Sequence, residues 1–259
     1  MKRLLEFAPE CLLCHVGYLA SLPEWFTAAR ASLQLGDILA FDVARADDAL
    51  TRLRPLAIDD MPRVMDHFYL WTPRSIPACR QDLLDALFEL TAVDFEHIIR
   101  PEQNRDNIRC LLNIISRHFQ GQRVARILDF GCGTGLSAQV ASELGIHLHG
   151  YDRCPKMRSL AAEQGLQLMV PEQFNNVCLP VFNAVFCSYV FHLLPTKDDL
   201  CQLWTILKPG GIVVGNFHKD HGLHEASTCF MKCGARAHEV EDVSCRFQHG
   251  SYWMFVRHE

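Results

Sequence analysis

The sequence lacks any apolar run that approaches the ~20 residues needed to cross a membrane, so we expect no membrane-spanning helix. Its beginning, MKRLLEFAPECLL, starts with basic residues and leucines as a secretory signal does. Glu6, Pro9 and Glu10 interrupt that run, however, and no small-residue cleavage site follows. These absences predict a cytoplasmic protein with no membrane partner.

The sequence also lacks internal repeats, low-complexity tracts and an excess of positive charge. Its 259 residues are 49% hydrophobic and 21% charged, which is typical of a globular protein with a full core. The formal net charge of -5 argues against a broad phosphate-binding surface. We therefore do not expect nucleic acid as a partner, and the oligomeric state is left open.

The twelve cysteines lack the arrangement of a disulfide framework in a small secreted protein. CLLCH, Cys11–His15, matches the C-x-x-C-H pattern of haem attachment, but it lies in an apolar run that indicates a core segment. The pairs Cys11/Cys14 and Cys229/Cys233 can each place two sulfurs on one helix face, yet neither has the second ligand pair of a closed zinc site. Reduced, structural thiols are the expectation.

The pattern of apolar residues changes near residue 105, which predicts two regions. Residues 1–104 are predicted to form a mainly helical N-terminal cap with proline-rich joints. In PEQNRDNIRCLLNIISRHF, apolar residues recur at helical spacing after Pro101, which marks a helix start. Over residues 105–259, short apolar strands alternate with helices, which predicts βαβ units and one parallel sheet with helices on both faces.

The end of the chain breaks this alternation. AHEVEDVSC and SYWMFVRH are strand-like segments joined by RFQHG, with no helix between them, and such a connection requires an antiparallel hairpin on the edge of the sheet. The predicted fold class is therefore α/β, with a Rossmann-like sheet.

The segment RILDFGCGTGLSAQV places three glycines between a strand and a helix. Gly131, Gly133 and Gly135 follow the first strand, where parallel sheets bind ligands, and a residue without a Cβ lets the backbone approach a ligand. The dinucleotide fingerprint needs its third glycine where this chain has Leu136. Asp152 ends the second strand and can accept both hydroxyls of a ribose, which indicates an adenosine-type ligand. A tight turn without a ligand is the alternative for the glycines.

Four segments in order, LDFGCGTG, GYD, FNAVFCSYVFHLLP and LKPGG, resemble the class I S-adenosylmethionine-dependent methyltransferases over about residues 105–259. The terminal hairpin matches the reversed strand of that family, so the resemblance implies a seven-stranded sheet, parallel with one reversed edge strand. It also implies methyltransferase activity with S-adenosylmethionine as the cofactor. In LKPGG, Lys208 is expected at the end of a helix, where a cation suits the exposed carbonyls.

The resemblance also implies a set of cofactor-binding residues. They are Asp129, Gly131, Cys132, Gly133, Gly135, Asp152, Arg153, Met157, Glu172, Gln173 and Ser188. Asp129 and the glycine backbone would surround the methionine part, Asp152 would bind the ribose, and Met157 would lie against the adenine or simply pack within its helix. The chain departs from the family pattern at Arg153, where an apolar residue is frequent, and after the third strand, where Glu172 or Gln173 has to replace the usual acid.

On the acceptor side, SYVFHLLP resembles the family segment beneath the transferred methyl group. His192 in this segment and His218 after the fifth strand are candidate catalytic bases, because imidazole titrates near neutral pH. A base is needed only if the acceptor has to lose a proton, and orienting the loop or the cofactor is the alternative for His192. Tyr189 is a candidate acceptor contact, with packing as its alternative. The carboxylates of a divalent-metal site are missing from both segments, so no metal is expected.

The N-terminal cap is expected to serve as a lid over the acceptor. DHFYLWTPRS concentrates aromatic residues beside a cation, so Tyr69, Trp71 and Arg74 are candidate substrate-binding residues for a flat organic molecule, with a core cluster as the alternative. The leading hypothesis is methyl transfer to the oxygen or nitrogen of a small molecule in a biosynthetic pathway. A methyltransferase acting on RNA or protein, and a non-catalytic binding subunit, are the alternatives.

Overall fold

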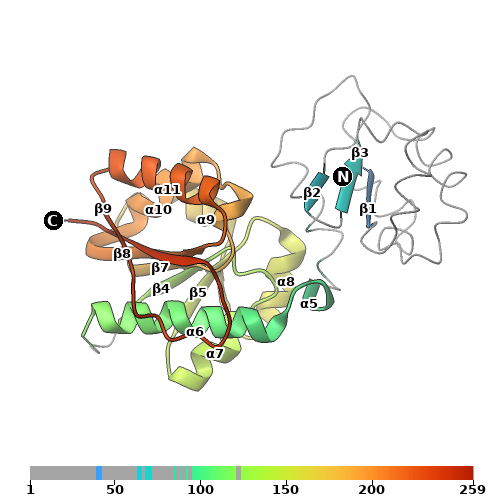
Figure 1. Cartoon of the computed structure of the whole chain (residues 1–259), viewed down its shortest axis with the longest axis horizontal. Helices are drawn as coiled ribbons and strands as arrows, with labels where there is room; N and C mark the ends of the chain where they lie inside the picture. The colour runs from blue at the N-terminus through green and yellow to red at the C-terminus, as the bar shows by residue number, and fades with distance from the viewer. Residues whose placement is uncertain are drawn as a thin grey trace, which may run out of the picture. The chain divides into compact units, whose positions relative to one another are not determined.

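The chain divides into two compact units, Met1–Val93 and Asp94–Glu259. The computed structural model describes residues 39–42, 63–65, 68–71, 85, 88, 92, 95–120 and 124–258. Figure 1 labels the elements of both units.

The first unit contains a small antiparallel sheet in the order β1-β3-β2. Its strands are Leu39–Asp42 (β1), Arg63–Met65 (β2) and Phe68–Trp71 (β3). The sequence did not predict these strands. Most of the predicted helical cap lies outside the described residues, so its helical character and its boundary at residue 104 stay predictions.

The second unit is built on a seven-stranded sheet in the order β6-β5-β4-β7-β8-β10-β9 (Figure 1). The strands are Ile127–Phe130 (β4), Leu148–Tyr151 (β5), Gln167–Met169 (β6), Phe182–Cys187 (β7), Leu207–Phe217 (β8), Arg236–Glu239 (β9) and Ser251–Val256 (β10). Neighbours from β6 to β8 are parallel, whereas β10 is antiparallel to β8 and β9. The predicted fold class is confirmed, with β9 outermost and the reversed strand β10 just inside it.

Helices cover both faces of the large sheet. They are Phe95–Ile98 (α5), Pro101–His118 (α6), Leu136–Leu144 (α7), Pro155–Glu163 (α8), Pro171–Asn176 (α9), Lys197–Ile206 (α10) and Asp220–Lys232 (α11), with one 3-10 turn at Phe191–Leu193 (η5). Helices α9, α10 and α11 lie on one face, and α6 and α7 lie on the other (Figure 1). The predicted start of α6 at Pro101 is confirmed. The short helix α9 was not predicted.

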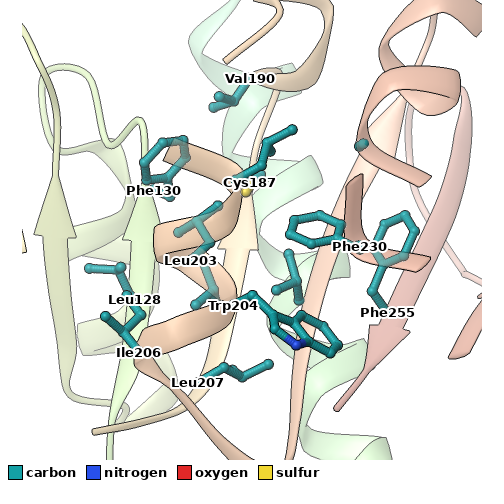
Figure 2. Close-up of a cluster of buried hydrophobic side chains, with 14 of the residues drawn as sticks. Leu128, Phe130, Cys187, Val190, Leu203, Trp204, Ile206, Leu207, Phe230 and Phe255 are labelled. Atoms are coloured by element: carbon teal, nitrogen blue, oxygen red, sulfur yellow. The ribbon is translucent and has the colours of Figure 1, made fainter. Parts of the chain in front are cut away.

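Two hydrophobic cores separate the sheet from its helices. Successive residues of a strand point to opposite faces, so β7 contributes to both cores. Val185 and Cys187 pack with α10 and α11, whereas Ala184 and Phe186 pack with α6 and α7. Figure 2 shows the first core, where Trp204 lies near Phe230. Because β4 is buried along its whole length, the segment that follows it starts from a rigid strand end.

The two ends of α10 have different stabilising contacts. Thr196 caps the start, since its Oγ1 accepts the N–H of Asp199 at 3.1 Å. At the other end the Arg257 guanidinium donates to the carbonyls of Trp204, Thr205 and Leu207. Lys208 had been expected there. It is instead the second residue of β8, so a cation distant in sequence takes that place.

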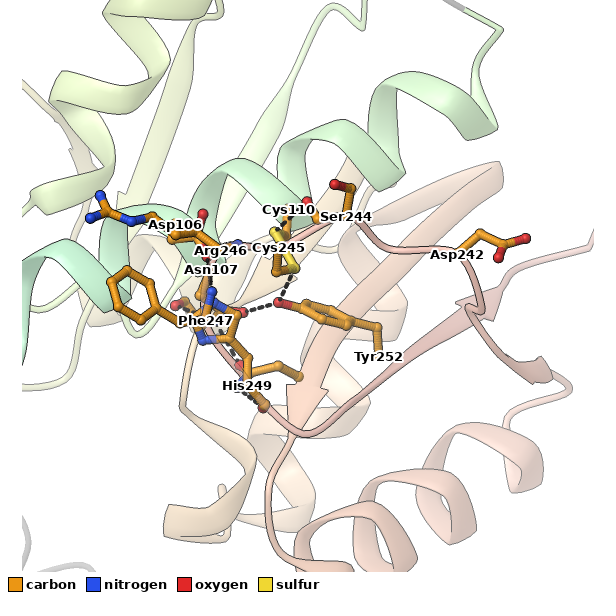
Figure 3. The surroundings of a disulfide bond; sticks show 12 residues. Asp106, Asn107, Cys110, Asp242, Ser244, Cys245, Arg246, Phe247, His249 and Tyr252 are labelled. Atoms are coloured by element: carbon orange, nitrogen blue, oxygen red, sulfur yellow. Dashed lines mark hydrogen bonds and ion pairs between the residues drawn. A yellow bond between two sulfur atoms is a disulfide. The ribbon is translucent and has the colours of Figure 1, made fainter.

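The loop between β9 and β10 lies along α6 (Figure 3). Cys245 of this loop forms a disulfide with Cys110 of α6, with Cα atoms 6.2 Å apart. This bond differs from the expected reduced thiols, and it joins residues separated by 135 positions. The seven other cysteines among the described residues are free thiols. No helix in this part of the chain is both long enough and apolar enough to cross a membrane.

Candidate functional site

The glycine-rich segment forms the turn from β4 into α7. The Gly131 N–H donates to the Tyr151 carbonyl at 2.8 Å, which fixes the turn to the end of β5. A Cβ on Gly131 would lie 2.5 Å from the Val190 side chain. Gly135 begins α7 with φ +90°, and a Cβ there would lie 2.8 Å from the Cα of Ala161 on α8. These two glycines are therefore required by packing.

Gly133 differs from the other two glycines. Its φ is +54°, and among the described residues an added Cβ would meet only Phe95, at 3.7 Å. Space beside the backbone is what a ligand lying against the turn requires. The neighbouring Cys132 is buried, and burial raises the pKa of its thiol, so it borders the turn as a neutral group.

Asp129 is a buried carboxyl beneath this turn. It is 3% exposed, and its Oδ1 has no hydrogen-bond partner among the described residues. Burial raises the pKa of Asp129 to about 7; the nearby Ser137 hydroxyl lowers it in part, and the charge of Asp152 raises it further. A cationic ligand group would supply the missing partner, so this position fits the ammonium group of a methionine-like ligand.

Asp152 directly follows β5 and holds the turn from the other side. Its Oδ2 accepts the Gly133 N–H and its Oδ1 accepts the Cys154 N–H, both at 2.9 Å. An ionised carboxylate accepts up to about four hydrogen bonds, so ribose hydroxyls can be bound without displacing these two. The glycine turn, Asp129 and Asp152 together therefore fit the predicted cofactor.

The residues predicted to surround the adenine come from three segments. Met157 of α8 is buried, at 1% exposure. Arg153 lies between β5 and α8, with Nη1 3.7 Å from an Asp199 carboxylate oxygen. Glu172 and Gln173 are exposed on α9, where the Gln173 side chain accepts a backbone N–H at the helix start. Their roles toward the cofactor stay predictions.

Three residues predicted for the acceptor side lie together beyond β7 and β8. The ring centroids of His192 and His218 are 4.5 Å apart, and those of Tyr189 and His218 are 5.6 Å apart. Tyr189 has φ +56°, a conformation that non-glycine residues adopt mainly at special sites. Burial lowers the pKa of His218, and the charge of Lys219 lowers it further. His218 is therefore neutral near pH 7 and can accept a proton.

A buried network, which the sequence did not predict, holds the acceptor segment. Asn107 of α6 is fully buried, and its Nδ2 donates to Ser188 Oγ at 2.8 Å and to Asn216 Oδ1 at 2.9 Å. Asn216 Oδ1 also accepts the Tyr189 N–H, at 2.8 Å. The Tyr252 hydroxyl donates to Asn107 Oδ1 at 2.6 Å. Because these groups are buried and paired, they fix the backbone after β7.

A second set of contacts orients the Tyr189 hydroxyl. It lies 2.5 Å from His249 Nδ1, and His249 Nε2 lies 2.9 Å from Asp106 Oδ2. Burial raises the pKa of Asp106, but hydrogen bonds from His249 and from the N–H groups of Phe247 and Arg246 outweigh burial and lower it overall (Figure 3). The Asp106 carboxylate therefore orients the His249 ring, which in turn holds the Tyr189 hydroxyl. The Gln103 side-chain amide also donates to this hydroxyl, at 3.3 Å.

These supporting residues had little signal in the sequence. His249 is 143 positions from Asp106 and 60 positions from Tyr189. Asn107 was the one visible sign, because a polar residue within the apolar stripe of a predicted helix has to find buried partners.

The predicted substrate residues of the cap are only partly described. Tyr69 and Trp71 belong to β3, where they pair with Phe41 and Leu39 of β1. Arg74 lies outside the described residues. Their contact with an acceptor stays a prediction.

Comparison with known proteins places this arrangement in a known group. Residues 97–258 match the family model described as a methyltransferase domain. The chain is 30% identical over 122 residues to phosphoethanolamine N-methyltransferase 2 of Caenorhabditis elegans, which covers 43% of this chain and 28% of that enzyme. It is 29% identical over 113 residues to the ubiquinone biosynthesis O-methyltransferase of Chromobacterium violaceum, which covers 39% of this chain and 47% of that enzyme. The chain therefore spans less than half of either relative.

Solved structures share the fold at low identity. The magnesium protoporphyrin IX methyltransferase of Synechocystis PCC 6803, solved with bound S-adenosylmethionine, superimposes with a TM-score of 0.51 and 17% identity. The superposition covers 70% of this chain and 98% of that protein.

Proposed function

Since this chain belongs to the S-adenosylmethionine-dependent methyltransferase family, we propose that it transfers a methyl group to the oxygen or nitrogen of a small organic molecule. One observation carries the proposal. The carboxyl ends of β4 and β5 bear Gly133, Asp129 and Asp152 in positions that fit the cofactor, and the ends of β7 and β8 bear Tyr189 and His218 beside them in the same sheet.

The cofactor side is proposed to work by complementary charge and shape. Gly133 gives the methionine chain access to the backbone, Asp129 pairs with its ammonium group, and Asp152 accepts the ribose hydroxyls. Met157 forms the apolar wall beside the adenine. S-adenosylmethionine supplies an activated methyl group when bound, so the remaining task of the chain is to place the acceptor in line and exclude water.

On the acceptor side, we propose that Tyr189 positions the acceptor and that a histidine removes its proton. His249 and Gln103 hold the Tyr189 hydroxyl, whose oxygen has two lone pairs and can accept a further hydrogen bond from the O–H or N–H of the acceptor. His192 takes the acceptor proton if the group methylated is a hydroxyl, and neutral His218 beside it is the second candidate base. An amine that is already neutral needs only the positioning.

Two further observations support a small acceptor. The relatives named above include enzymes for phosphoethanolamine and for ubiquinone biosynthesis, which are small molecules. The formal net charge of -5 does not favour a nucleic-acid surface. The cytoplasmic location and the lid role of residues 1–104, with Tyr69, Trp71 and Arg74 as an acceptor wall, are parts of the same proposal.

The test is formation of S-adenosylhomocysteine from S-adenosylmethionine in the presence of small acceptors. A panel of phenols, amino alcohols and amino sugars, each assayed alone with the full chain, should contain at least one compound that is methylated at oxygen or nitrogen. RNA and a protein extract are assayed in parallel. Methylation confined to RNA or protein would contradict the small-molecule proposal, and failure of calorimetry to detect cofactor binding would contradict the activity itself.

A further inference from the structure

Three free cysteines meet on the helices that cover one face of the sheet. Cys229 lies in the last turn of α11 and Cys233 directly follows the helix as its C-cap, and the structure brings Cys201 of α10 to them. The Sγ atoms of Cys201 and Cys229 are 3.9 Å apart, and all three Sγ atoms lie within 4.8 Å of one another. The sequence showed only the α11 pair, which lacked further ligands. Cys201 supplies the third.

The sulfur positions fit a single small cation. With metal–sulfur bonds of about 2.3 Å, two thiolates bound to one ion lie roughly 3.8–4.0 Å apart in tetrahedral or trigonal geometry. The observed 3.9 Å between Cys201 and Cys229 is within this range, and the Cys233 sulfur lies within 4.8 Å of both. Cys229 is buried, Cys201 is half-buried and Cys233 is exposed, so a cation can enter from the Cys233 side.

The surroundings of the cluster disfavour thiolate sulfurs unless a cation is bound to them. Burial raises the pKa of the Cys229 thiol to about 12 and also raises that of Cys233. The neighbouring Cys201 sulfur raises both pKa values further, whereas a hydrogen bond with Cys229 lowers that of Cys233. Without a bound cation, Cys229 and Cys233 are therefore neutral thiols. The ammonium of Lys197, at the start of α10, acts in the opposite direction on both groups. It would offset the excess negative charge of a divalent ion with three thiolates.

We propose that Cys201, Cys229 and Cys233 form a three-sulfur site for a thiophilic cation such as Zn²⁺, with a water molecule as the fourth ligand. Binding forms three sulfur–metal bonds and releases three thiol protons to solvent, so no oxidant is needed. The site joins α10 to α11 and uses none of the residues assigned to methyl transfer. It therefore stands or falls independently of the proposed function.

The experiment is a metal-protection footprint on the reduced full-length chain, with Cd²⁺ as the probe. N-ethylmaleimide alkylates accessible thiols, and mass spectrometry of the peptides measures the rate at each cysteine separately. Cys178 is the matched control, because it is an exposed free cysteine outside the cluster. We expect Cd²⁺ to slow alkylation of Cys233 by at least about tenfold and to leave Cys178 unchanged. Because each peptide is measured separately, binding at Cys11 and Cys14 does not enter the result.

Two variants show whether the three sulfurs act together. Cys201→Ser should abolish the protection of Cys233, and Cys233→Ser should abolish the protection of Cys201, which guards against one variant failing to fold. Unchanged alkylation of Cys233 in the presence of Cd²⁺ would overturn the site. Full protection that survives in a folded Cys201→Ser protein would also overturn it, because the α11 pair alone would then bind the ion.

Discussion

At the scale of single residues, the buried carboxyl of Asp129 couples cofactor binding to pH. Its pKa is raised from 3.8 to about 7, so the native chain keeps the proton where the unfolded chain has lost it. As pH rises from 3.8 toward 7, this group therefore lowers the free energy of unfolding. A bound ammonium group stabilises the carboxylate and therefore lowers the pKa of Asp129 again.

We predict that affinity for S-adenosylmethionine increases as pH rises through the pKa of Asp129 and that binding below this pKa releases a proton. Calorimetry in two buffers of different ionisation enthalpy measures both quantities. Asp129→Asn is the control, since it keeps the shape of the side chain and removes its titration. Equal pH dependence in the variant and the parent would show that Asp129 does not face the ammonium group.

His192 and Tyr189 are expected to affect different kinetic constants. If the acceptor is a hydroxyl, His192→Ala should lower kcat by ~10²- to 10⁴-fold with little change in cofactor Kd, because only proton transfer is lost. Tyr189→Phe keeps the ring and removes the hydroxyl, so it should mainly raise the acceptor KM. Steady-state kinetics and cofactor titration on both variants separate these roles. A weaker cofactor complex in His192→Ala would instead indicate a loop-bracing role.

At the scale of elements, substitutions at two glycines of the turn between β4 and α7 should affect stability and cofactor binding differently. Gly135→Ala adds a Cβ against the backbone of α8 at a left-handed position, and we expect a loss of about 2–5 kcal/mol in the free energy of unfolding. Gly133→Ala has room for its methyl group and should cost only about 1–2 kcal/mol. It should nevertheless weaken cofactor binding, because the methyl occupies ligand space. Denaturant unfolding and cofactor titration measure the two effects, and unaltered affinity in Gly133→Ala would place the ligand elsewhere.

The end of α10 gives a second pair of matched variants. Arg257→Ala removes a cation that donates to three carbonyls at the helix end and should lower the free energy of unfolding by about 1–2 kcal/mol. Lys208→Ala, at the position favoured by the sequence, should change it by less than about 0.5 kcal/mol. Thermal unfolding of both variants checks the comparison. A larger loss of stability in Lys208→Ala than in Arg257→Ala would show that Lys208 stabilises the helix end, as the sequence predicts.

The elements also show which parts of the structure the sequence determines locally. Strands such as β4 and β7 are short apolar runs ended by glycine or a polar residue, so their position, their parallel orientation and the segments after them could be predicted. The strand β2 is three residues long and α9 is six, too short for a period to appear. The network from Asn107 to Asn216 spans 109 positions and depends on tertiary packing, so the partners of Tyr189 could not be predicted.

At the scale of the whole molecule, the cofactor residues and both hydrophobic cores belong to the second unit. Its sheet contains every strand end that bears a predicted cofactor residue, and the helices of both cores lie within Asp94–Glu259. The predicted acceptor wall at Tyr69, Trp71 and Arg74 belongs to the first unit. Cofactor binding should therefore depend on the second unit alone, whereas acceptor turnover should depend on both units.

We predict that residues 94–259 expressed alone fold and bind S-adenosylmethionine within about threefold of the full chain, because the glycine turn, Asp129 and Asp152 all keep their contacts. Acceptor turnover should fall far more than cofactor affinity, since the proposed lid would no longer hold the acceptor or exclude water. Calorimetry and the S-adenosylhomocysteine assay on both proteins make the comparison, with circular dichroism as the folding control. Full turnover by the shorter protein would remove the first unit from the acceptor site. Loss of cofactor binding in a folded fragment would show that the first unit completes the cofactor site.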